Sequence, residues 1–240
     1  MNSLVFVMHV IITGASRGLG KAFATKFAEE GYDLFLCSLN AANLYKALEE
    51  LMTSFPDRTI KAKPFDLSKK EEATSFAKWI LDAGVVPDVL INNAGQFLPG
   101  HVHNEKEGVL EQMIETNLYS AYHLTRGLLP SMMNARKGHI FNICSIASLK
   151  AYSAGGSYGI SKFALSGFSK NLREEMKTYG IKVTAVYPGA TYTDSWAGSG
   201  VREDRIMEAR DIADMVFGAT QLSAQACVED IIIRPQLGDL

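Results

Sequence analysis

The sequence predicts an α/β fold in which one doubly wound sheet of about seven parallel strands carries helices on both faces. Strand-like apolar runs alternate with helical patterns along the whole chain. Several of these runs are continuously apolar, as is typical of strands that are buried on both faces. A glycine-rich turn joins the first run to the first helical segment. For the first six strands we therefore expect the spatial order 3-2-1-4-5-6.

Seven strands are expected, at 9–13, 33–39, 59–65, 88–92, 139–145, 182–188 and 230–234. The first belongs to an apolar run that begins at Leu4, and we interpret the residues before Met8 as an extension. Pro64 cannot donate a ladder hydrogen bond, so the third strand is expected at an edge of the sheet. The segments between the strands are long enough for covering helices, at 19–30, 41–54, 69–82, 105–133, 158–179 and 208–221.

Composition favours an ordinary globular protein with a single domain over residues 1–240. The chain is 47% hydrophobic and 21% charged and contains no internal repeat or low-complexity tract. Its 24 basic and 26 acidic side chains are evenly spread and give a net charge of −2, which argues against a nucleic-acid surface or a polybasic membrane anchor. The apolar run over 4–12 is shorter than the ~20 residues of a membrane span. We predict a cytoplasmic protein with a small-molecule partner, no nucleic acid and no membrane.

The cysteines and histidines do not form a pattern that predicts a disulfide framework or a metal site. Cys37, Cys144 and Cys227 are odd in number, far apart and within apolar runs, which predicts reduced, buried thiols. His101 and His103 have no third ligand at a suitable spacing, so we interpret them as solvated loop residues and predict no metal.

The turn "TGASRGLG" spans Thr13 to Gly20, at the carboxyl end of the first strand. Its backbone N–H groups and the positive end of the following helix dipole suit a diphosphate. The glycines Gly14, Gly18 and Gly20 have the spacing G-x-x-x-G-x-G, which differs from the commoner dinucleotide fingerprint. From the turn alone, a second interpretation stays open, in which it only closes a βα unit.

Four polar residues downstream suggest chemistry. Tyr158 and Lys162 are four residues apart and share a helix face, where the ammonium could stabilise a phenolate. Ser145 is expected at the end of the fifth strand, where its hydroxyl could polarise a carbonyl, and Asn117 interrupts an apolar helix face. Each has a structural alternative when taken alone: an exposed Tyr/Lys packing pair, a strand-end hydroxyl and a satisfied buried amide.

Together these motifs resemble the short-chain dehydrogenase/reductase superfamily, core soluble subgroup, from His9 to Leu240. "TGASRGLG" is similar to its cofactor turn, "NNAG" (92–95) to its fourth-strand motif, and "PGATYT" (188–193) to its nicotinamide loop. Asn117, Ser145, Tyr158 and Lys162 resemble its catalytic tetrad. The resemblance implies a Rossmann fold that binds NAD(P) through Gly14, Ser16, Arg17, Gly18, Leu19, Gly20, Ser38, Asp66, Leu67, Asn93, Ala94, Gly95, Tyr158, Lys162, Pro188, Gly189, Thr191 and Thr193.

The resemblance also implies roles. Asp66 would bind the adenine amino group, although a carboxylate in a helix-initiating turn is a competing interpretation. Asn93 and Gly95 would lie near the adenine ribose, and Thr193 would hold the nicotinamide carboxamide. For the tetrad, the implied reaction is carbonyl reduction: Tyr158 protonates the oxygen, Ser145 hydrogen-bonds it, Lys162 favours phenolate and binds the nicotinamide ribose, and Asn117 connects Lys162 to solvent through a bent helix and an ordered water.

The sequence favours an NADP(H)-dependent carbonyl reductase and leaves two alternative functions open. One is an NAD-dependent alcohol dehydrogenase. The other is a non-catalytic, cofactor-sensing regulator, a class that typically loses the tyrosine or lysine that this chain keeps.

The end of the second strand favours NADP(H) over NAD(H). NAD-specific relatives usually place a carboxylate there, whereas this chain has Ser38, and Asp33 lies at the opposite end of the strand. Arg17 could bind a 2′-phosphate, unless it is simply a solvated residue. Leu39 stands where many NADP-linked relatives have a second basic residue, so NAD(H) stays a candidate.

The substrate walls are expected from 95–104, 148–157 and 193–204, with Phe97, Leu98, Tyr152 and Trp196 as apolar surface and a short substrate loop near 193–207. A homo-oligomer, dimer or tetramer, is expected through the helices at 105–133 and 158–179. Their bulky side chains exceed what one sheet contact would bury, notably Tyr119, Tyr122, Phe163 and Phe168.

Overall fold

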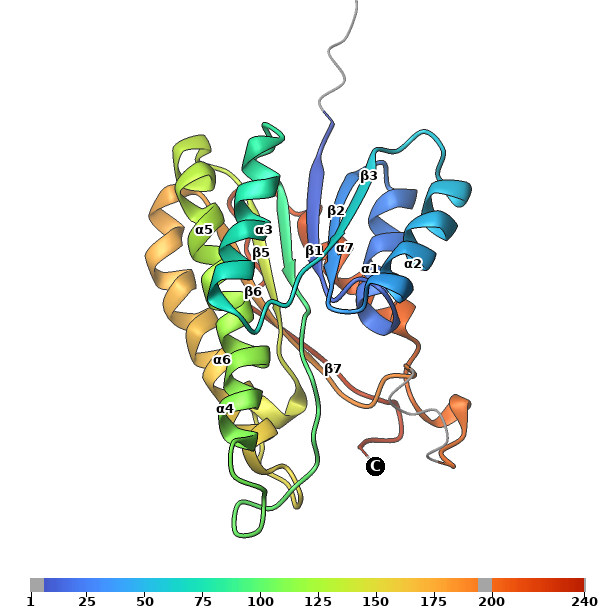
Figure 1. Cartoon of the computed structure of the whole chain (residues 1–240), viewed down its shortest axis with the longest axis vertical. Helices are drawn as coiled ribbons and strands as arrows, with labels where there is room; N and C mark the ends of the chain where they lie inside the picture. Colours follow the sequence, from blue (N-terminus) through green and yellow to red (C-terminus); the bar gives the residue numbers. More distant parts are fainter. Residues whose placement is uncertain (1–6, 194–199, 240) are drawn as a thin grey trace, which may run out of the picture.

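The computed structural model describes residues 7–193 and 200–239 (Figure 1). Its strands are β1 (His9–Thr13), β2 (Asp33–Ser38), β3 (Ile60–Pro64), β4 (Val89–Asn92), β5 (His139–Ile143), β6 (Lys182–Pro188) and β7 (Asp230–Ile233). Its α-helices are α1 (Gly18–Glu29), α2 (Ala41–Ser54), α3 (Lys70–Asp82), α4 (Val109–Ile114), α5 (Ser120–Ala135), α6 (Gly156–Met176) and α7 (Ala209–Thr220).

All seven of these strands form one parallel sheet in the order β3-β2-β1-β4-β5-β6-β7. The predicted fold class and the order of the first six strands are confirmed, and β7 adds to the β6 edge. β3 forms the other edge, where Pro64 pairs with Ser38, as the missing N–H of proline requires. The order reverses between β1 and β4, so a crevice is expected at their carboxyl ends.

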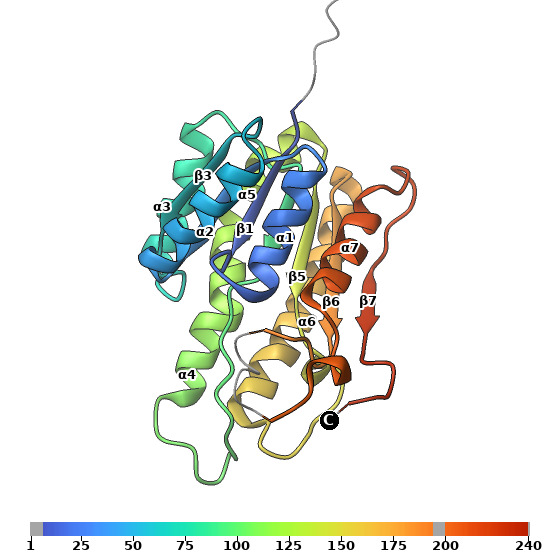
Figure 2. The same cartoon turned by 90° about the vertical axis from the view of Figure 1, so that its right-hand side faces the viewer.

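Helices cover both faces of the sheet. α1, α2 and α7 lie on one side and α3, α5 and α6 on the other, and the turned view shows α7 beside α1 (Figures 1 and 2). Adjacent side chains of β1 lie on opposite faces of the sheet. Ile12 packs in the core under α1, whereas Ile11 packs in the core under α3 and α5. Both side chains are fully buried, which explains why the strand sequences are continuously apolar.

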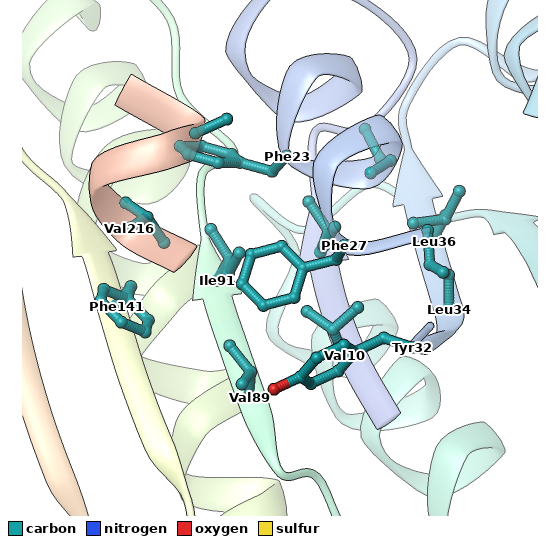
Figure 3. Close-up of a cluster of buried hydrophobic side chains, with 14 of the residues drawn as sticks. Val10, Phe23, Phe27, Tyr32, Leu34, Leu36, Val89, Ile91, Phe141 and Val216 are labelled. Carbon is teal, nitrogen blue, oxygen red and sulfur yellow. The ribbon is translucent and has the colours of Figure 1, made fainter. Parts of the chain in front are cut away.

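Aromatic side chains fill the core under α1 and α7. The Phe27 ring lies with its centroid 5.0 Å from that of Tyr32 and 5.7 Å from that of Phe217. Val10 and Ile91 contribute from the sheet to the same core (Figure 3). This packing fixes α1, and with it the turn that precedes α1.

Some element boundaries differ from the prediction. The helix expected at 105–133 begins at Val109 and is interrupted by a π-helix, η1 (Glu115–Tyr119). β5 ends at Ile143 instead of 145, and a 3-10 turn, η2 (Ile146–Ser148), follows. Two further 3-10 turns are η3 (Lys177–Tyr179) and η5 (Glu203–Arg205).

The three thiols are free, as predicted, but only two of them are buried. Cys37 and Cys144 lie in the core, whereas Cys227 is half-buried, because it precedes the edge strand β7 and not a central one. No helix among the described residues is long and apolar enough to cross a membrane.

Candidate active site

The glycine turn lies at the carboxyl end of β1 and leads directly into α1. Gly14 has φ +64°, a left-handed conformation that favours glycine. A Cβ at Gly20 would lie 2.1 Å from the Gly14 carbonyl oxygen and 2.7 Å from the Asn93 side-chain nitrogen. Gly20 therefore lets the start of α1 pack closely against the turn and against Asn93.

Thr13 and Asn93 connect the ends of β1 and β4. The Thr13 hydroxyl oxygen accepts hydrogen bonds from the backbone N–H groups of Asn93 and Ala94, at 2.9 and 2.8 Å. In return, the Asn93 amide donates to the carbonyl oxygens of Thr13 and Gly14. These bonds join the glycine turn after β1 to the segment after β4, and Thr13 was not among the predicted site residues.

Tyr158 stands in the first turn of α6. Burial raises the pKa of its phenol to about 12, although a hydrogen bond with the Ser145 side chain opposes part of the rise. The aromatic ring of Phe97 packs edge-on against the Tyr158 ring, with centroids 4.8 Å apart. The phenol is therefore protonated at neutral pH and can act as a proton donor.

Lys162 is buried one helical turn beyond Tyr158. Its ammonium donates to the Ile143 carbonyl oxygen at 2.8 Å and lies 5.9 Å from the centroid of the Tyr158 ring. Burial lowers the pKa of Lys162 to about 8. Stabilisation of the phenolate by this ammonium stays a prediction, since burial is the main cause of the upward shift in the pKa of Tyr158.

Ser145 lies two residues beyond the end of β5 and caps the η2 turn. Its hydroxyl oxygen accepts a hydrogen bond from the Ala147 N–H at 3.1 Å, and the Ser148 hydroxyl accepts from the Ser145 N–H. The Ser145 hydroxyl also hydrogen-bonds the Tyr158 side chain. The expected position at the strand end is thus corrected to the cap of the next turn, which fixes the hydroxyl beside Tyr158.

Asn117 is fully buried in the π-helix η1, behind the Tyr158–Lys162 pair. Its side-chain oxygen accepts from the Gln96 N–H at 2.7 Å, and its side-chain nitrogen donates to the Gln96 carbonyl at 3.0 Å and to the Ser161 hydroxyl at 2.9 Å. The Ser161 hydroxyl donates onward to the Tyr158 carbonyl. The bent helix that the resemblance implied is therefore this π-helix, and Asn117 connects the segment after β4 to α6.

A cavity of about 280 Å³ joins most of these groups at the carboxyl ends of the strands. Ten predicted residues line it: Leu19, Asn93, Gly95, Ser145, Tyr158, Lys162, Pro188, Gly189, Thr191 and Thr193. The other lining residues are Gln96, Phe97, Ile143 and Cys144. Of these four, Gln96 and Phe97 belong to the substrate wall expected over 95–104.

The loop after β6 forms one wall of the cavity. Thr191 is buried and pairs with Met207, and its hydroxyl donates to the Gly189 carbonyl. A Cβ at Gly18 would lie 3.2 Å from the Thr193 methyl carbon, so this loop faces the glycine turn directly. The cavity thus runs from the turn to Tyr158, as a bound dinucleotide would require.

The predicted adenosine end lies beside this cavity, at the end of β2. The hydroxyl oxygens of Ser16 and Ser38 are 2.9 Å apart, and the Ser38 carbonyl accepts from the Phe65 N–H. Arg17 is exposed at the N-cap of α1, and Leu39 is exposed as well. Asp33 accepts from the Thr59 N–H at the far end of the strand, away from the crevice.

The Asp66 carboxylate is hydrogen-bonded within the turn that precedes α3, as the alternative to adenine binding predicted. The carboxylate accepts from the Ser68 N–H and hydroxyl, and Lys69 lies 3.3 Å away. Burial alone would raise the pKa of Asp66, but these partners lower it below the usual value. The side chain of the next residue, Leu67, is buried in the core under α3. Leu67 could therefore contact a ligand only through its backbone.

The remaining candidates fall outside the cavity. Tyr152 lines a separate apolar groove along α6, and Leu98 is half-buried in the loop after β4. Trp196 lies outside the described residues. The described part of the chain holds no group of three or more His, Cys, Asp or Glu side chains that could bind a metal. The rings of His101 and His103 lie near each other, with their centroids 5.6 Å apart.

Sequence reasoning missed Thr13, Ser161 and the Gln96 and Ile143 backbones. Ser161 could have been found, because it lies three residues after Tyr158 and so shares its helix face. The two backbone contacts leave no signal, since any residue type supplies an N–H or carbonyl.

Known proteins match the chain over nearly its whole length. A model of the short chain dehydrogenase family matches residues 8–204. An uncharacterized oxidoreductase of Staphylococcus epidermidis is 28% identical over 225 residues, covering 94% of this chain and 96% of the relative.

Two solved structures share both fold and sequence. An alcohol dehydrogenase from the archaeon Thermococcus sibiricus, complexed with 5-hydroxy-NADP, has a TM-score of 0.87 and 27% identity, with 96% of this chain and 97% of that one covered. A metagenomic short-chain oxidoreductase in complex with NADP has a TM-score of 0.83 and 30% identity, with 95% and 97% covered. This chain therefore belongs to the short-chain dehydrogenase/reductase superfamily and is an NAD(P)-dependent oxidoreductase.

Proposed function

We propose that this protein is an NADP(H)-dependent reductase that converts a carbonyl to an alcohol reversibly, with Tyr158 as the proton donor. The observation that carries the proposal is that Tyr158 and Ser145 line the same cavity, with their side chains hydrogen-bonded to each other. A carbonyl oxygen that gains negative charge needs both a hydrogen bond and a proton. This pair of groups supplies them from fixed elements.

Each residue has a task in that reaction. The bound nicotinamide would supply a hydride to the carbonyl carbon. Tyr158 gives its proton to the carbonyl oxygen, and Ser145 donates a hydrogen bond to the same oxygen. Lys162 lies behind Tyr158, where its ammonium stabilises the phenolate that remains and can bind ribose hydroxyls. In the oxidation direction, Tyr158 takes the proton back.

Residues of the crevice support NADP(H) as the cofactor. The glycine turn would hold the diphosphate, and Thr193 the carboxamide. The Ser16–Ser38 hydroxyl pair places neutral donors where a carboxylate would repel a 2′-phosphate, and Arg17 lies exposed in the same turn. Of the two structural relatives described above, one is a complex with 5-hydroxy-NADP and the other a complex with NADP.

NAD-dependent alcohol oxidation is the second candidate. It is favoured by the exposed Leu39, which adds no charge for a 2′-phosphate, and by the name of the archaeal relative, an alcohol dehydrogenase. A cofactor-sensing regulator without catalysis is the third, and it has the least support because Tyr158 and Lys162 are both in place.

The whole chain, 1–240, is proposed to act as one NAD(P)-binding domain in the cytoplasm. The described strands all join one sheet, and the three cysteines are free. A homo-oligomer is proposed through α4–α6, because Tyr119, Ile160 and Phe163 are about half exposed there. Tyr122 and Phe168 contribute less than the sequence suggested, since their rings pack on each other within the chain.

A spectrophotometric screen tests the function. NADPH and NADH are each offered with ketones, aldehydes, quinones, sugars, acyl thioesters and pterin-like carbonyls, and oxidation of the cofactor is followed. Reduction of at least one class, with higher kcat/KM for NADPH, is expected. Binding of cofactor without turnover of any carbonyl, or of any alcohol with the oxidised cofactors, would favour the regulator.

The Tyr158→Phe variant tests the proton donor. Phenylalanine keeps the ring that packs on Phe97 but has no proton to give, so kcat should fall by roughly 10²–10⁴-fold. Affinity for NADPH, measured by fluorescence titration, should change less than about twofold, because the hydroxyl is a minor part of cofactor binding. Tyr179→Phe, beyond the end of α6, is the control and should keep wild-type kcat. A Tyr158→Phe variant with near wild-type kcat would exclude this residue as the acid.

A further inference from the structure

Glu105 lies at the end of the loop between β4 and α4 and reaches the first turn of α6. One carboxylate oxygen accepts from the Ser157 N–H at 2.9 Å, and the other accepts from the Ser157 hydroxyl. Ser157 immediately precedes Tyr158 in the chain. The carboxylate therefore contacts the helical turn that carries the proposed proton donor.

The first turn of α6 needs such a partner from outside. Its N-cap is Gly155, which has no side chain to accept from the orphan N–H groups, and the turn contains no acidic residue. A carboxylate beside a helix N-terminus is also favoured by the helix dipole. Hydrogen bonds from Ser157 lower the pKa of Glu105, so the carboxylate is ionised at neutral pH.

Two glycines make room for Glu105. A Cβ at Gly156 would lie 2.0 Å from a Glu105 carboxylate oxygen, and one at Gly100 would lie 2.7 Å from the same side chain. Gly156 has φ +36°, a backbone conformation that side chains rarely adopt. The Gly100 N–H donates to the Ala154 carbonyl. The loop after β4 and the loop before α6 therefore run side by side at the carboxyl end of the sheet (Figure 1).

The same loop is held at its other end. Gln96 is bound by Asn117, and Asn117 also bonds Ser161 on α6. Between the two ends, Phe97 packs on the ring of Tyr158. Tyr158 is thus bracketed by contacts to the residue before it and the residue three after it, and the loop covers its ring.

We propose that Glu105 is a positioning residue, which sets the orientation of Tyr158 by holding Ser157 against the loop after β4. Glu105 does not line the cavity and would act through α6. The proposal rests on the proposed function for its effect on rate, but the contact itself can be measured without turnover.

The first test uses Glu105→Gln, which keeps the size of the side chain but offers one acceptor oxygen in place of two and no charge. We expect kcat to fall about 10–100-fold, since small displacements of a reacting group have effects of that order. KM for NADPH and the midpoint of thermal unfolding should stay near wild type. Glu107→Gln, two residues further along and exposed, is the matched control and should leave kcat unchanged.

Ser157 gives the complementary test. Ser157→Ala removes one of the two donors and should lower kcat by a few fold, whereas Ser157→Thr keeps both and should stay within about twofold of wild type. Adding Ser157→Ala to Glu105→Gln should cost less than the product of the two single losses, because both act on one contact.

Hydrogen exchange tests the contact independently of chemistry. Backbone amides of residues 157–162 should exchange about tenfold faster in Glu105→Gln than in Glu107→Gln, as local opening of the first turn becomes easier. Unchanged exchange, or wild-type kcat in Glu105→Gln while Tyr158→Phe is inactive, would overturn the positioning role. Wild-type kcat in Tyr158→Phe would instead overturn the proposed function and leave the exchange result to decide the contact.

Discussion

Lys162 is a buried lysine whose burial opposes folding as long as its ammonium is charged. Its pKa is lowered from 10.5 to about 8, so the folded state loses the proton before the unfolded state does. Below about pH 8 the opposition to folding is present in full, and it fades between about pH 8 and 10.5, where the unfolded state binds more protons. One hydrogen bond, to the Ile143 carbonyl, offsets part of this cost.

Lys162→Met should therefore stabilise the protein at pH 7, by about 1–3 kcal/mol after the lost hydrogen bond is allowed for. The gain should shrink as the pH rises from 8 to 10.5. Urea unfolding of variant and wild type at pH 7 and pH 10 measures it, with Lys170→Met, an exposed lysine on the same helix, as control. If Lys162→Met were less stable than wild type at both pH values, burial of the ammonium would not be destabilising. We also expect Lys162→Met to lose activity, but that loss does not test the cost of burial.

Ser38 tests the cofactor preference at the scale of one side chain. Ser38→Asp places a carboxylate beside Ser16, where it would repel a 2′-phosphate and could accept from the ribose hydroxyls of NADH. We expect kcat/KM for NADPH to fall about 100-fold, with NADH retained or improved. Ser38→Asn, of similar size and uncharged, should change the NADPH/NADH ratio far less. An equal loss in both variants would show that packing, not charge, sets the preference.

At the scale of elements, the π-helix η1 is what turns Asn117 toward α6. A π-helical turn widens the backbone and rotates the residues that follow, so the segment between α4 and α5 presents a polar side chain inward. That side chain satisfies both backbone groups of Gln96 and reaches Ser161. One residue thus connects three elements around the cavity.

Asn117→Ala should cost about 2–4 kcal/mol of the free energy of unfolding, because it removes three hydrogen bonds of a fully buried amide and takes a partner from the buried Ser161 hydroxyl. It should also lower kcat, since the segment that carries Gln96 and Phe97 loses its attachment to α6. Chemical denaturation and steady-state kinetics measure the two effects. Asn171→Ala, an exposed asparagine on α6, is expected to cost less than about 0.5 kcal/mol. If Asn117→Ala lost as little free energy of unfolding as Asn171→Ala, the hydrogen bonds of the Asn117 amide would not stabilise the fold.

At the scale of the whole molecule, the outer face of α6 is less polar than a solvent-facing helix requires. Ile160 and Phe163 are each 46% exposed, and both border an apolar groove that Val102 and Tyr152 also line. Neighbouring exposed apolar side chains can form a surface for interaction with another protein chain. Association of copies of the chain would cover it.

We expect light scattering at micromolar concentration to give a multiple of the 26.3 kDa chain mass. Phe163→Glu should reduce that mass, because a charge buried in a self-association surface is costly. Phe97→Glu, which is equally exposed but lies in the cavity, controls for added charge and should leave the mass unchanged. A monomer in the wild type would remove the proposal.

The sequence by itself determined the sheet and the position of the crevice. Strands of continuous apolar residues require cover on both faces, Pro64 excludes β3 from the middle of the sheet, and the glycine turn marks the carboxyl end of β1. These features are local: each depends on residues that are neighbours in the chain. The spacing of Tyr158 and Lys162 is equally local, and the resemblance to the superfamily adds Asn117 and Ser145 to complete the tetrad.

Only the tertiary structure decided how those residues are held and charged. Glu105 and Ser157 are 52 residues apart, and Asn117 and Ser161 are 44 apart, so no local pattern records either contact. The upward shift in the pKa of Tyr158 likewise follows from burial, which depends on the loops packed around it and not on its spacing from Lys162. Local preferences fix which segments become strands and helices, whereas the burial and partners of a side chain depend on all the segments that the fold brings to the same place.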